Sequence, residues 1–291
     1  MTDLKFVSWE KYWDKKELIE IPGRGTFNIY TLNADSPWIL ICIHGAGHSA
    51  LSFSLLAEAL KCSCTIIAPD LKCHGETPGD AAKDLSIESL TEDCVAICNY
   101  FKKDDKKLLL MGHSLGGCIT ARASKVIKPK GLFVIDTVEG VATASMPKMH
   151  YLLAGRPNSF KSEKDVIHYI GSSGEMNNYQ SAAVSAPGRV VKKGDEYVWR
   201  TNLLPSEPFW NDWFKGFAQI FIGAPTYKVI ILPNVDRLDT PFTIGHMSGK
   251  FQLEIVHGTQ HCMHEDRPDD IAAIVKRLLE RLQEVPIVWK L

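Results

Sequence analysis

The sequence predicts an α/β fold with a mostly parallel, doubly wound sheet. Three observations predict it: apolar runs of strand length alternate with helix-compatible segments, several of these runs are apolar throughout, and one leads into the pattern Gly-x-Ser-x-Gly. Alternation of strand and helix is typical of parallel sheets covered by helices on both faces, and strands buried on both faces lack polar positions. At 291 residues the chain suits one large core, so we expect a single domain over residues 1–291.

The elements are expected in the following order. Residues 17–21 and 26–32 alternate between apolar and polar positions around Pro22-Gly23-Arg24-Gly25, which predicts an opening hairpin and an antiparallel edge to the sheet. Further strands are expected at residues 38–43, 64–68, 108–111, 131–135, 227–232 and 251–256. Helices are expected at residues 54–60, 85–101, 118–126 and 271–282. Strand and helix therefore alternate through most of the chain.

The segment from about residue 141 to 225 has a different character. Its strand-like runs fade, and we interpret it as a helical cap inserted over the edge of the sheet that carries the active site. Aromatic residues in this segment have helical spacing, and they are Phe209, Trp210, Trp213, Phe214 and Phe217. Two interpretations of them stay open: packing of an amphipathic helix onto the core, or a wall that faces substrate.

Composition argues against several functional classes. The formal net charge of −1 favours neither nucleic acid nor an anionic membrane surface. No apolar run approaches the ~18 residues of a membrane span, and residues 1–20 lack the apolar core of a secretory signal. The eight cysteines lie mostly in apolar runs, as buried free thiols do, and no His/Cys pair completes a zinc site. We expect a soluble intracellular protein, cytoplasmic and with the nucleus as a second compartment, with no metal site.

Ser114 is the candidate nucleophile. It lies in Gly112-His113-Ser114-Leu115-Gly116, between an apolar strand and a helix-compatible segment. This pattern is typical of the nucleophile elbow, a strained turn that holds the serine hydroxyl above the sheet, and the two glycines avoid collisions with neighbouring backbone. The alternative is a serine without catalytic function in an ordinary turn between a strand and a helix. The context of strand and helix favours the nucleophile.

An activated serine needs a base, an acid that orients the base, and donors for the oxyanion. His261 lies between the last expected strand and the last helix, where the chain order Ser…Asp…His places the base; His257 and His264 are rivals. Asp236, beside Asp239, and Asp136 compete for the acid, and position alone leaves the choice open while favouring Asp236. These acids also have structural interpretations: Asp236 or Asp239 pairs with Arg237 or caps a turn, and Asp136 caps a helix.

The oxyanion hole is expected from two backbone N–H groups. One belongs to Leu115, directly after the nucleophile, and the other to Ala46 in the loop His44-Gly45-Ala46-Gly47. His44 and His48 are interpreted as hydrogen-bonded loop residues, because the base comes late in this chain order. Residues 70–75 contain a D-x-x-x-H-G turn whose role we expect to be structural.

Longer stretches of the chain resemble one family in particular. They are residues 44–52, 74–77, 112–117, 135–140, 155–162, 235–239, 244–252 and 264–266. In these stretches the sequence is similar to protein phosphatase methylesterases, α/β-hydrolases that remove the methyl ester from the C-terminal leucine of the type 2A phosphatase catalytic subunit. Several of the stretches are particular to this family rather than common to hydrolases, so the resemblance is more specific than the elbow.

The resemblance implies roles for individual residues. It makes Ser114 the nucleophile, Asp136 the acid and His261 the base, and it reverses the preference for Asp236, which stays the alternative. The chain departs from the family where Ala46 and Gln260 replace glycines. An acidic low-complexity insertion found in some members before residues 197–200 is also absent, which puts in doubt any partner contact made through that insertion.

The resemblance also implies an activity and a partner. The expected activity is a serine carboxylesterase without cofactor, acting on the methylated C-terminal tail of the type 2A phosphatase catalytic subunit and its holoenzymes. In the family the phosphatase helps to assemble the active triad and carries metal ions that the esterase displaces. The alternatives are a small-molecule esterase or lipase of the same fold, and a non-catalytic hydrolase module that only binds the phosphatase.

Overall fold

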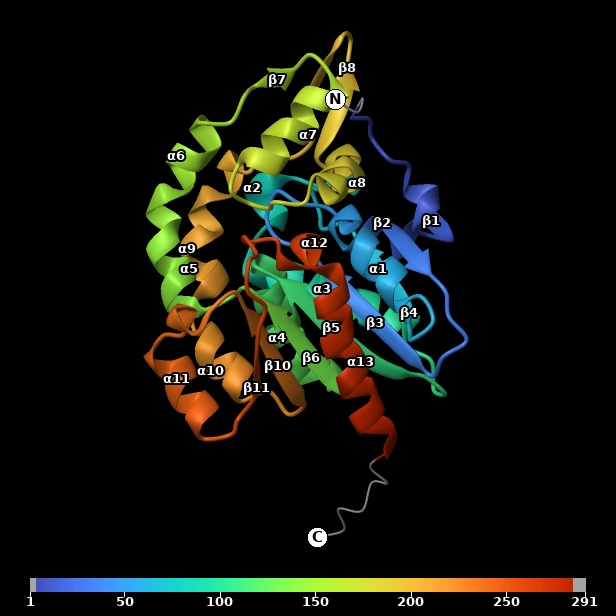
Figure 1. Cartoon of the computed structure of the whole chain (residues 1–291), viewed down its shortest axis with the longest axis vertical. Coiled ribbons are helices and arrows are strands. Elements are labelled where there is room, and N and C mark those ends of the chain that lie inside the picture. The colour runs from blue at the N-terminus through green and yellow to red at the C-terminus, as the bar shows by residue number, and fades with distance from the viewer. Residues whose placement is uncertain (1–3, 285–291) are drawn as a thin grey trace.

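An eight-stranded sheet forms the centre of the structure, a computed structural model that describes residues 4–284 (Figure 1). In spatial order its strands are β1 (Lys15–Ile21), β2 (Gly25–Leu32), β4 (Thr65–Pro69), β3 (Trp38–Ile43), β5 (Lys107–His113), β6 (Gly131–Ile135), β10 (Tyr227–Leu232) and β11 (Gln252–Ile255). The hairpin β1–β2 is antiparallel and β2 also pairs antiparallel with β4, whereas all later pairs are parallel. The expected mostly parallel sheet with an antiparallel edge is confirmed.

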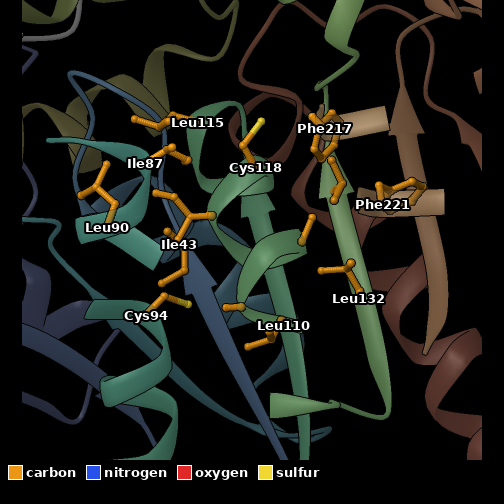
Figure 2. Packing of buried hydrophobic residues seen from close by; sticks show 14 of the residues in the cluster. Ile43, Ile87, Leu90, Cys94, Leu110, Leu115, Cys118, Leu132, Phe217 and Phe221 are labelled. Carbon is orange, nitrogen blue, oxygen red and sulfur yellow. The ribbon is translucent and has the colours of Figure 1, made fainter. Parts of the chain in front are cut away.

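Helices cover both faces of this sheet. On one face, α3 (Ile87–Phe101), α4 (Leu115–Ile127) and α10 (Phe217–Ile222) share one apolar cluster with the central strands. Figure 2 shows this packing, with Ile43, Leu110 and Leu132 of the strands facing the helices. On the other face, α1 (Ser54–Leu60) and α13 (Pro268–Glu284) share a second cluster with the same sheet. A sheet covered on both faces explains why β3 is buried along its whole length.

Local sequence explains where the helices begin and which side they bury. The Ser86 side chain accepts a hydrogen bond from the backbone N–H of Ser89, so α3 begins after a capping serine rather than at residue 85. In α13 the buried residues Ile271, Val275 and Leu278 are spaced by three and four positions and face the sheet. Burial of one such side chain stabilises the fold by about 1.5–3 kcal/mol.

The chain between β6 and β10 leaves the main sheet. It forms α5 (Glu139–Ser145), η3 (Met146–Lys148), α6 (Met149–Ala154), α7 (Glu163–Ser172), α8 (Tyr179–Arg189), η4 (Leu204–Phe209), α9 (Trp210–Phe214) and finally α10. It also contains a three-stranded antiparallel sheet of β7 (Ser159–Phe160), β9 (Glu196–Trp199) and β8 (Val190–Lys193). This small sheet was not predicted, because strands of two to four residues leave no apolar run. Helices α7 and α8 lie together at one end of the molecule, and α5, α6 and α9 lie along one side (Figure 1).

The remaining elements complete the expected order. They are η1 (Trp9–Lys11), η2 (Ala50–Phe53), α2 (Ala81–Asp84), η5 (Val235–Arg237), α11 (Thr240–Met247) and α12 (Met263–Asp266). All eight cysteines are free, and most are buried, as expected; Cys62 is exposed and Cys73 is partly exposed. No helix between residues 4 and 284 combines the length and the apolar character that a membrane crossing requires.

Candidate active site

Ser114 lies at the sharp turn between β5 and α4. Its backbone has φ 52° and ψ −121°, a left-handed conformation that is strained for a residue with a side chain. Its N–H donates to the carbonyl of Ile135 at 3.1 Å, and its own carbonyl accepts the N–H of Gly117 at 2.8 Å. The turn is therefore held from both sides, and α4 begins directly after it, three residues earlier than expected.

Close backbone contacts explain the two glycines of the elbow. A Cβ on Gly112 would overlap the backbone of Gly116, and a Cβ on Gly116 would overlap the carbonyl oxygen of Ile43 in the neighbouring strand. Any side chain at either position would push β5, α4 and β3 apart. The expected role of both glycines is thus visible in the structure.

His261 and Asp136, the candidate base and acid, contact each other directly. Nδ1 of His261 lies 2.8 Å from Oδ2 of Asp136, which follows β6 at φ 44°. The Asp136 side chain is 3% exposed and that of His261 is 39% exposed. Arg237 also approaches Asp136, with Nη2 at 3.8 Å from Oδ2. Because Asp136 engages Nδ1, the basic Nε2 of His261 is free to face the pocket.

The rival residues lie elsewhere. Asp236 is exposed on η5, and His257 is exposed after β11. Asp239 caps α11 by accepting the N–H of Phe242, which is the structural role considered for it. His264 is buried on the other side of His113, where desolvation lowers its pKa to about 3. Arg237 turns towards Asp136 rather than pairing with Asp236 or Asp239.

The loop after β3 is held by two neutral imidazoles. His44 donates through Nδ1 to the carbonyl of Gly45 at 2.8 Å and accepts the N–H of Leu71 at Nε2 at 3.0 Å. His74 donates through Nδ1 to the carbonyl of Lys72 and accepts the N–H of Gly47 at 2.9 Å. These bonds join the two loops and position Ala46, which lines the same pocket as Leu115 and Ser114. As the first residue of α4, Leu115 has an N–H without a partner inside the helix.

Because these two imidazoles are buried and neutral, we expect the protein to lose stability in mild acid. Burial lowers the pKa of His44 to about 4, and burial together with His44 lowers the pKa of His74 to about 3. Below pH 6.5, the ordinary pKa of histidine, these side chains bind protons in the unfolded chain but stay neutral in the folded chain. We expect the free energy of unfolding to fall by up to about 1.4 kcal/mol per pH unit for each histidine as the pH drops from 6.5 towards 4.

Urea denaturation at a series of pH values measures this effect. Glu265, whose pKa burial raises to about 8, contributes with the opposite sign, so the comparison needs a matched variant. In His74→Gln the amide oxygen still accepts the Gly47 N–H but does not titrate. Its free energy of unfolding should decline less steeply than that of the unaltered protein. Equal slopes in the two proteins would contradict the prediction.

His113, the residue before Ser114 in the elbow motif, contacts the loop of His261. Its Nε2 lies 3.0 Å from the backbone carbonyl of His261, so Nε2–H donates to that carbonyl. The ring is fully buried, and burial together with His261 and His264 lowers its pKa well below the ordinary value. Sequence reasoning did not assign this role, because the position appears in the motif only as a variable residue.

Loss of this hydrogen bond should slow ester hydrolysis. His113→Phe keeps a buried ring but leaves the His261 carbonyl without its donor, which costs about 1–3 kcal/mol of positioning. We expect kcat to fall by roughly 10- to 100-fold with little change in KM. His113→Gln, whose amide nitrogen takes the place of Nε2, should recover part of the rate. Unchanged kcat in the phenylalanine variant, measured on an activated ester, would exclude the positioning role.

A pocket of about 400 Å³ brings these groups together. Its floor contains Ser114, Leu115, Ala46, Asp136 and His261. Ser114 and His261 are not hydrogen-bonded to each other within the part of the chain that the structure describes. The other walls come from the insertion and are mostly apolar, with Val141, Met146, Met149, Leu153, Trp213 and Phe214 among them. Trp213 and Phe214 are also buried in the main cluster, so both interpretations of the aromatic segment hold for them.

Charged residues close one end of the pocket. Glu175 accepts from Arg189 at 2.7 Å and from Arg156 at 3.3 Å, and its pKa is lowered by these two guanidinium groups against the opposing effect of burial. The backbone carbonyl of Glu175 accepts the N–H of Cys262 at 2.8 Å, beside His261. The N–H groups of Asn177 and Asn178 donate to Asp266. The insertion is thus bonded to the loop of the candidate base.

Comparison with known proteins identifies the family of the chain. The model of the alpha/beta hydrolase family matches residues 40–274. Protein phosphatase methylesterase 1 of Rattus norvegicus is 34% identical, over 96% of this chain and 86% of the rat protein. Protein phosphatase methylesterase 1 of Schizosaccharomyces pombe is 38% identical, over 94% of this chain and 85% of the yeast protein. The chain belongs to the protein phosphatase methylesterase family.

Solved structures agree with the fold of this methylesterase family member. E-2-(acetamidomethylene)succinate hydrolase superposes with a TM-score of 0.76 at 16% identity, over 91% of this chain and 99% of that one. An alpha/beta hydrolase from Novosphingobium aromaticivorans superposes with a TM-score of 0.72 at 16% identity, over 92% and 98% of the two chains. At this identity the likeness shows the α/β-hydrolase fold alone. The resemblance of the sequence to methylesterases is confirmed by the relatives.

Proposed function

We propose that this chain is a serine carboxylesterase that removes the methyl ester from the C-terminal leucine of the type 2A protein phosphatase catalytic subunit. The observation that carries the proposal is the convergence of a strained serine, an imidazole held by a buried carboxylate and an oxyanion loop in one pocket. The substrate follows from the family, whose members in animals and fungi are named protein phosphatase methylesterases.

The first half of the reaction forms an acyl-enzyme. Ser114 Oγ attacks the ester carbonyl carbon while Nε2 of His261 takes the hydroxyl proton. This transfer needs Oγ and Nε2 at hydrogen-bond distance, and we propose that binding of the phosphatase completes that contact, since such bonds often tighten only in the complex. Backbone N–H groups of Ala46 and Leu115 stabilise the oxyanion. His261 then protonates the departing methoxide, which leaves as methanol.

The second half restores the enzyme. A water molecule gives a proton to His261 and attacks the acyl-enzyme carbonyl, and collapse of the intermediate returns the proton to Ser114 and releases the free carboxylate. Asp136 keeps the imidazole oriented and stabilises its charged form in both halves. One ester and one water therefore yield one carboxylic acid and one methanol.

The insertion suits a chain end as substrate. Its apolar wall, with Met149, Leu153 and Phe214, offers burial to a leucine side chain, whereas a carboxy-terminal ester needs no room for residues beyond the scissile bond. We propose that residues 141–225 act as a cap on a single hydrolase domain. We also propose that the protein works in the cytoplasm and the nucleus, where its eight free thiols stay reduced.

Mass spectrometry tests the function directly. The methylated phosphatase catalytic subunit is incubated with the protein, and its C-terminal peptide is expected to lose the mass of one CH2. The same assay with short free methyl esters separates a protein methylesterase from a small-molecule esterase. Equal or faster turnover of the free esters, with the phosphatase tail left methylated, would refute the proposed substrate.

A further inference from the structure

Three residues that the ester chemistry does not use meet beside the catalytic pocket. They are His48, in the loop after β3, Cys262, next to His261, and Glu265, on α12. His48 is 5% exposed, and Cys262 and Glu265 are fully buried. One nitrogen, sulfur or oxygen atom from each lies within 4.8 Å of the other two. The fold therefore gathers an imidazole, a thiol and a carboxyl group in one buried place.

Two polar atoms of this cluster lack hydrogen-bond partners among the described residues. Nδ1 of His48 and Oε1 of Glu265 face each other at 3.9 Å, too far apart for a hydrogen bond. Within residues 4–284, neither atom has a hydrogen-bond partner. Buried polar atoms are nearly always satisfied, so two facing atoms without partners indicate a missing third atom between them.

A tetrahedral metal ion fits this arrangement. Zinc binds imidazole nitrogen at about 2.0–2.1 Å and carboxylate oxygen at about 2.0–2.2 Å, so two such ligands lie about 3.4 Å apart at a tetrahedral angle. The observed separation of 3.9 Å needs an inward movement of a few tenths of an ångström on each side. The other nitrogen of His48, Nε2, lies 3.9 Å from Sγ of Cys262 and 4.0 Å from Oε2 of Glu175.

The second carboxyl oxygen of Glu265 is already anchored. Its Oε2 accepts a hydrogen bond from the hydroxyl of Ser181 at 3.2 Å, which leaves Oε1 aimed into the cluster. We propose that His48, Cys262 and Glu265 form a binding site for one Zn²⁺ ion. An imidazole and a thiolate favour a thiophilic ion of this kind over Mg²⁺ or Ca²⁺, which prefer oxygen ligands.

The charged groups near the cluster favour reversible binding of the ion. The buried guanidinium of Arg189 acts on Cys262 and Glu265 and is paired with Glu175. The Cys262 thiolate and the carboxylates of Glu175 and Glu265 carry three negative charges, against four positive charges on Zn²⁺, Arg189 and Arg156. Binding releases the protons of the Cys262 thiol and the Glu265 carboxyl group to solvent, and the nearby guanidinium groups compete with the ion for the same anions. His48 lines the catalytic pocket, which gives the ion a route in and an open fourth position for water.

Occupancy of the site should inhibit ester hydrolysis. The ion would join the loop after β3, which carries Ala46, to the loop that carries His261. His261 must approach Ser114 during proton transfer, and a metal bond to the adjacent Cys262 restrains that movement. This inhibitory effect rests on the proposed function, whereas the binding of Zn²⁺ does not.

The test measures binding and activity separately on the full chain. The protein is freed of metal with EDTA, and Zn²⁺ binding is followed by calorimetry. Co²⁺ is used as a spectroscopic substitute, because a thiolate ligand gives it a charge-transfer absorption band. We expect about one equivalent of Zn²⁺ per chain and the loss of nitrophenyl ester hydrolysis on binding, reversed by EDTA.

Matched variants decide which residues bind the ion. Loss of the hydrogen-bond partner of a metal ligand typically weakens metal binding by roughly 10- to 100-fold. Cys262→Ala and His48→Gln each remove a ligand itself, so each should weaken Zn²⁺ binding by at least this factor. Cys62→Ala removes the exposed thiol and should leave binding unchanged. Circular dichroism confirms folding of each variant, and activity is compared with the same variant without metal.

Each outcome has a defined meaning. Absence of Zn²⁺ binding overturns the site, and so does binding in Cys262→Ala and His48→Gln that is as strong as in the unaltered protein. Binding without inhibition overturns the inhibitory role and supports the site. If the metal-free protein hydrolyses no ester at all, the proposed function fails, while the calorimetric and Co²⁺ results still decide the metal site.

Discussion

Ser114→Ala is expected to abolish ester hydrolysis. Removal of the nucleophile eliminates the acyl-enzyme route, and by comparison with other serine hydrolases the loss in kcat should be on the order of 10⁶-fold. The alanine keeps the elbow, because its Cβ occupies the position of the serine Cβ, so the free energy of unfolding should change little. Demethylation of the phosphatase tail by mass spectrometry and hydrolysis of an activated ester measure the loss.

A control serine separates the nucleophile from general effects. Ser172 is exposed at the end of α7 and lies outside the pocket, so Ser172→Ala should retain the rate. Labelling by a fluorophosphonate probe should disappear in Ser114→Ala and persist in the control. Ester hydrolysis or labelling that survives in Ser114→Ala would exclude Ser114 as the nucleophile.

Asp136→Asn is expected to reduce kcat by roughly 10⁴-fold, whereas Asp236→Asn should change it by less than about twofold. The Asp136 carboxylate holds the Nδ1–H of His261 at 2.8 Å, and an amide neither stabilises the imidazolium nor fixes the same tautomer. Asp236 is exposed on η5 and makes no such contact. Steady-state kinetics on one ester measures both variants.

The two aspartates provide controls for each other. Each substitution removes one negative charge at nearly constant volume, so a change in net charge alone affects both equally. Circular dichroism shows whether Asp136→Asn, whose backbone has positive φ, keeps its fold. A greater loss in Asp236→Asn than in Asp136→Asn would assign the acid to Asp236 instead.

Much of the main sheet follows from sequence pattern. The strands at 38–43, 131–135 and 227–232 and the helix at 54–60 have the expected limits, because their apolar runs end sharply at polar or glycine residues. The small sheet in the insertion could not be predicted, because the strand Ser159–Phe160 is too short to show an alternation of apolar and polar residues. α4 begins at Leu115 rather than residue 118, because the elbow turns directly into the helix.

The site was predictable in part. Motif order indicated Ser114 and His261, but position alone favoured Asp236 for the acid, and only the family resemblance pointed to Asp136. Contacts across large distances in the sequence were out of reach: 214 positions separate His48 from Cys262. No spacing rule links such residues, and only the fold brings them together. The same is true of the bond from His113 to the His261 carbonyl.

The bonds between residues 175–178 and residues 262–266 tie the insertion to the loop of His261 at one side of the pocket. The backbone N–H groups of Cys262, Asn177 and Asn178 donate these hydrogen bonds, so this side of the pocket is held in place. On the side of the pocket formed by α5 and α6, Tyr151 and Leu152 are 81% and 62% exposed, and Leu152 also lines the pocket. We therefore expect a peptide tail to enter past α6, away from the bonds that hold the loop of His261.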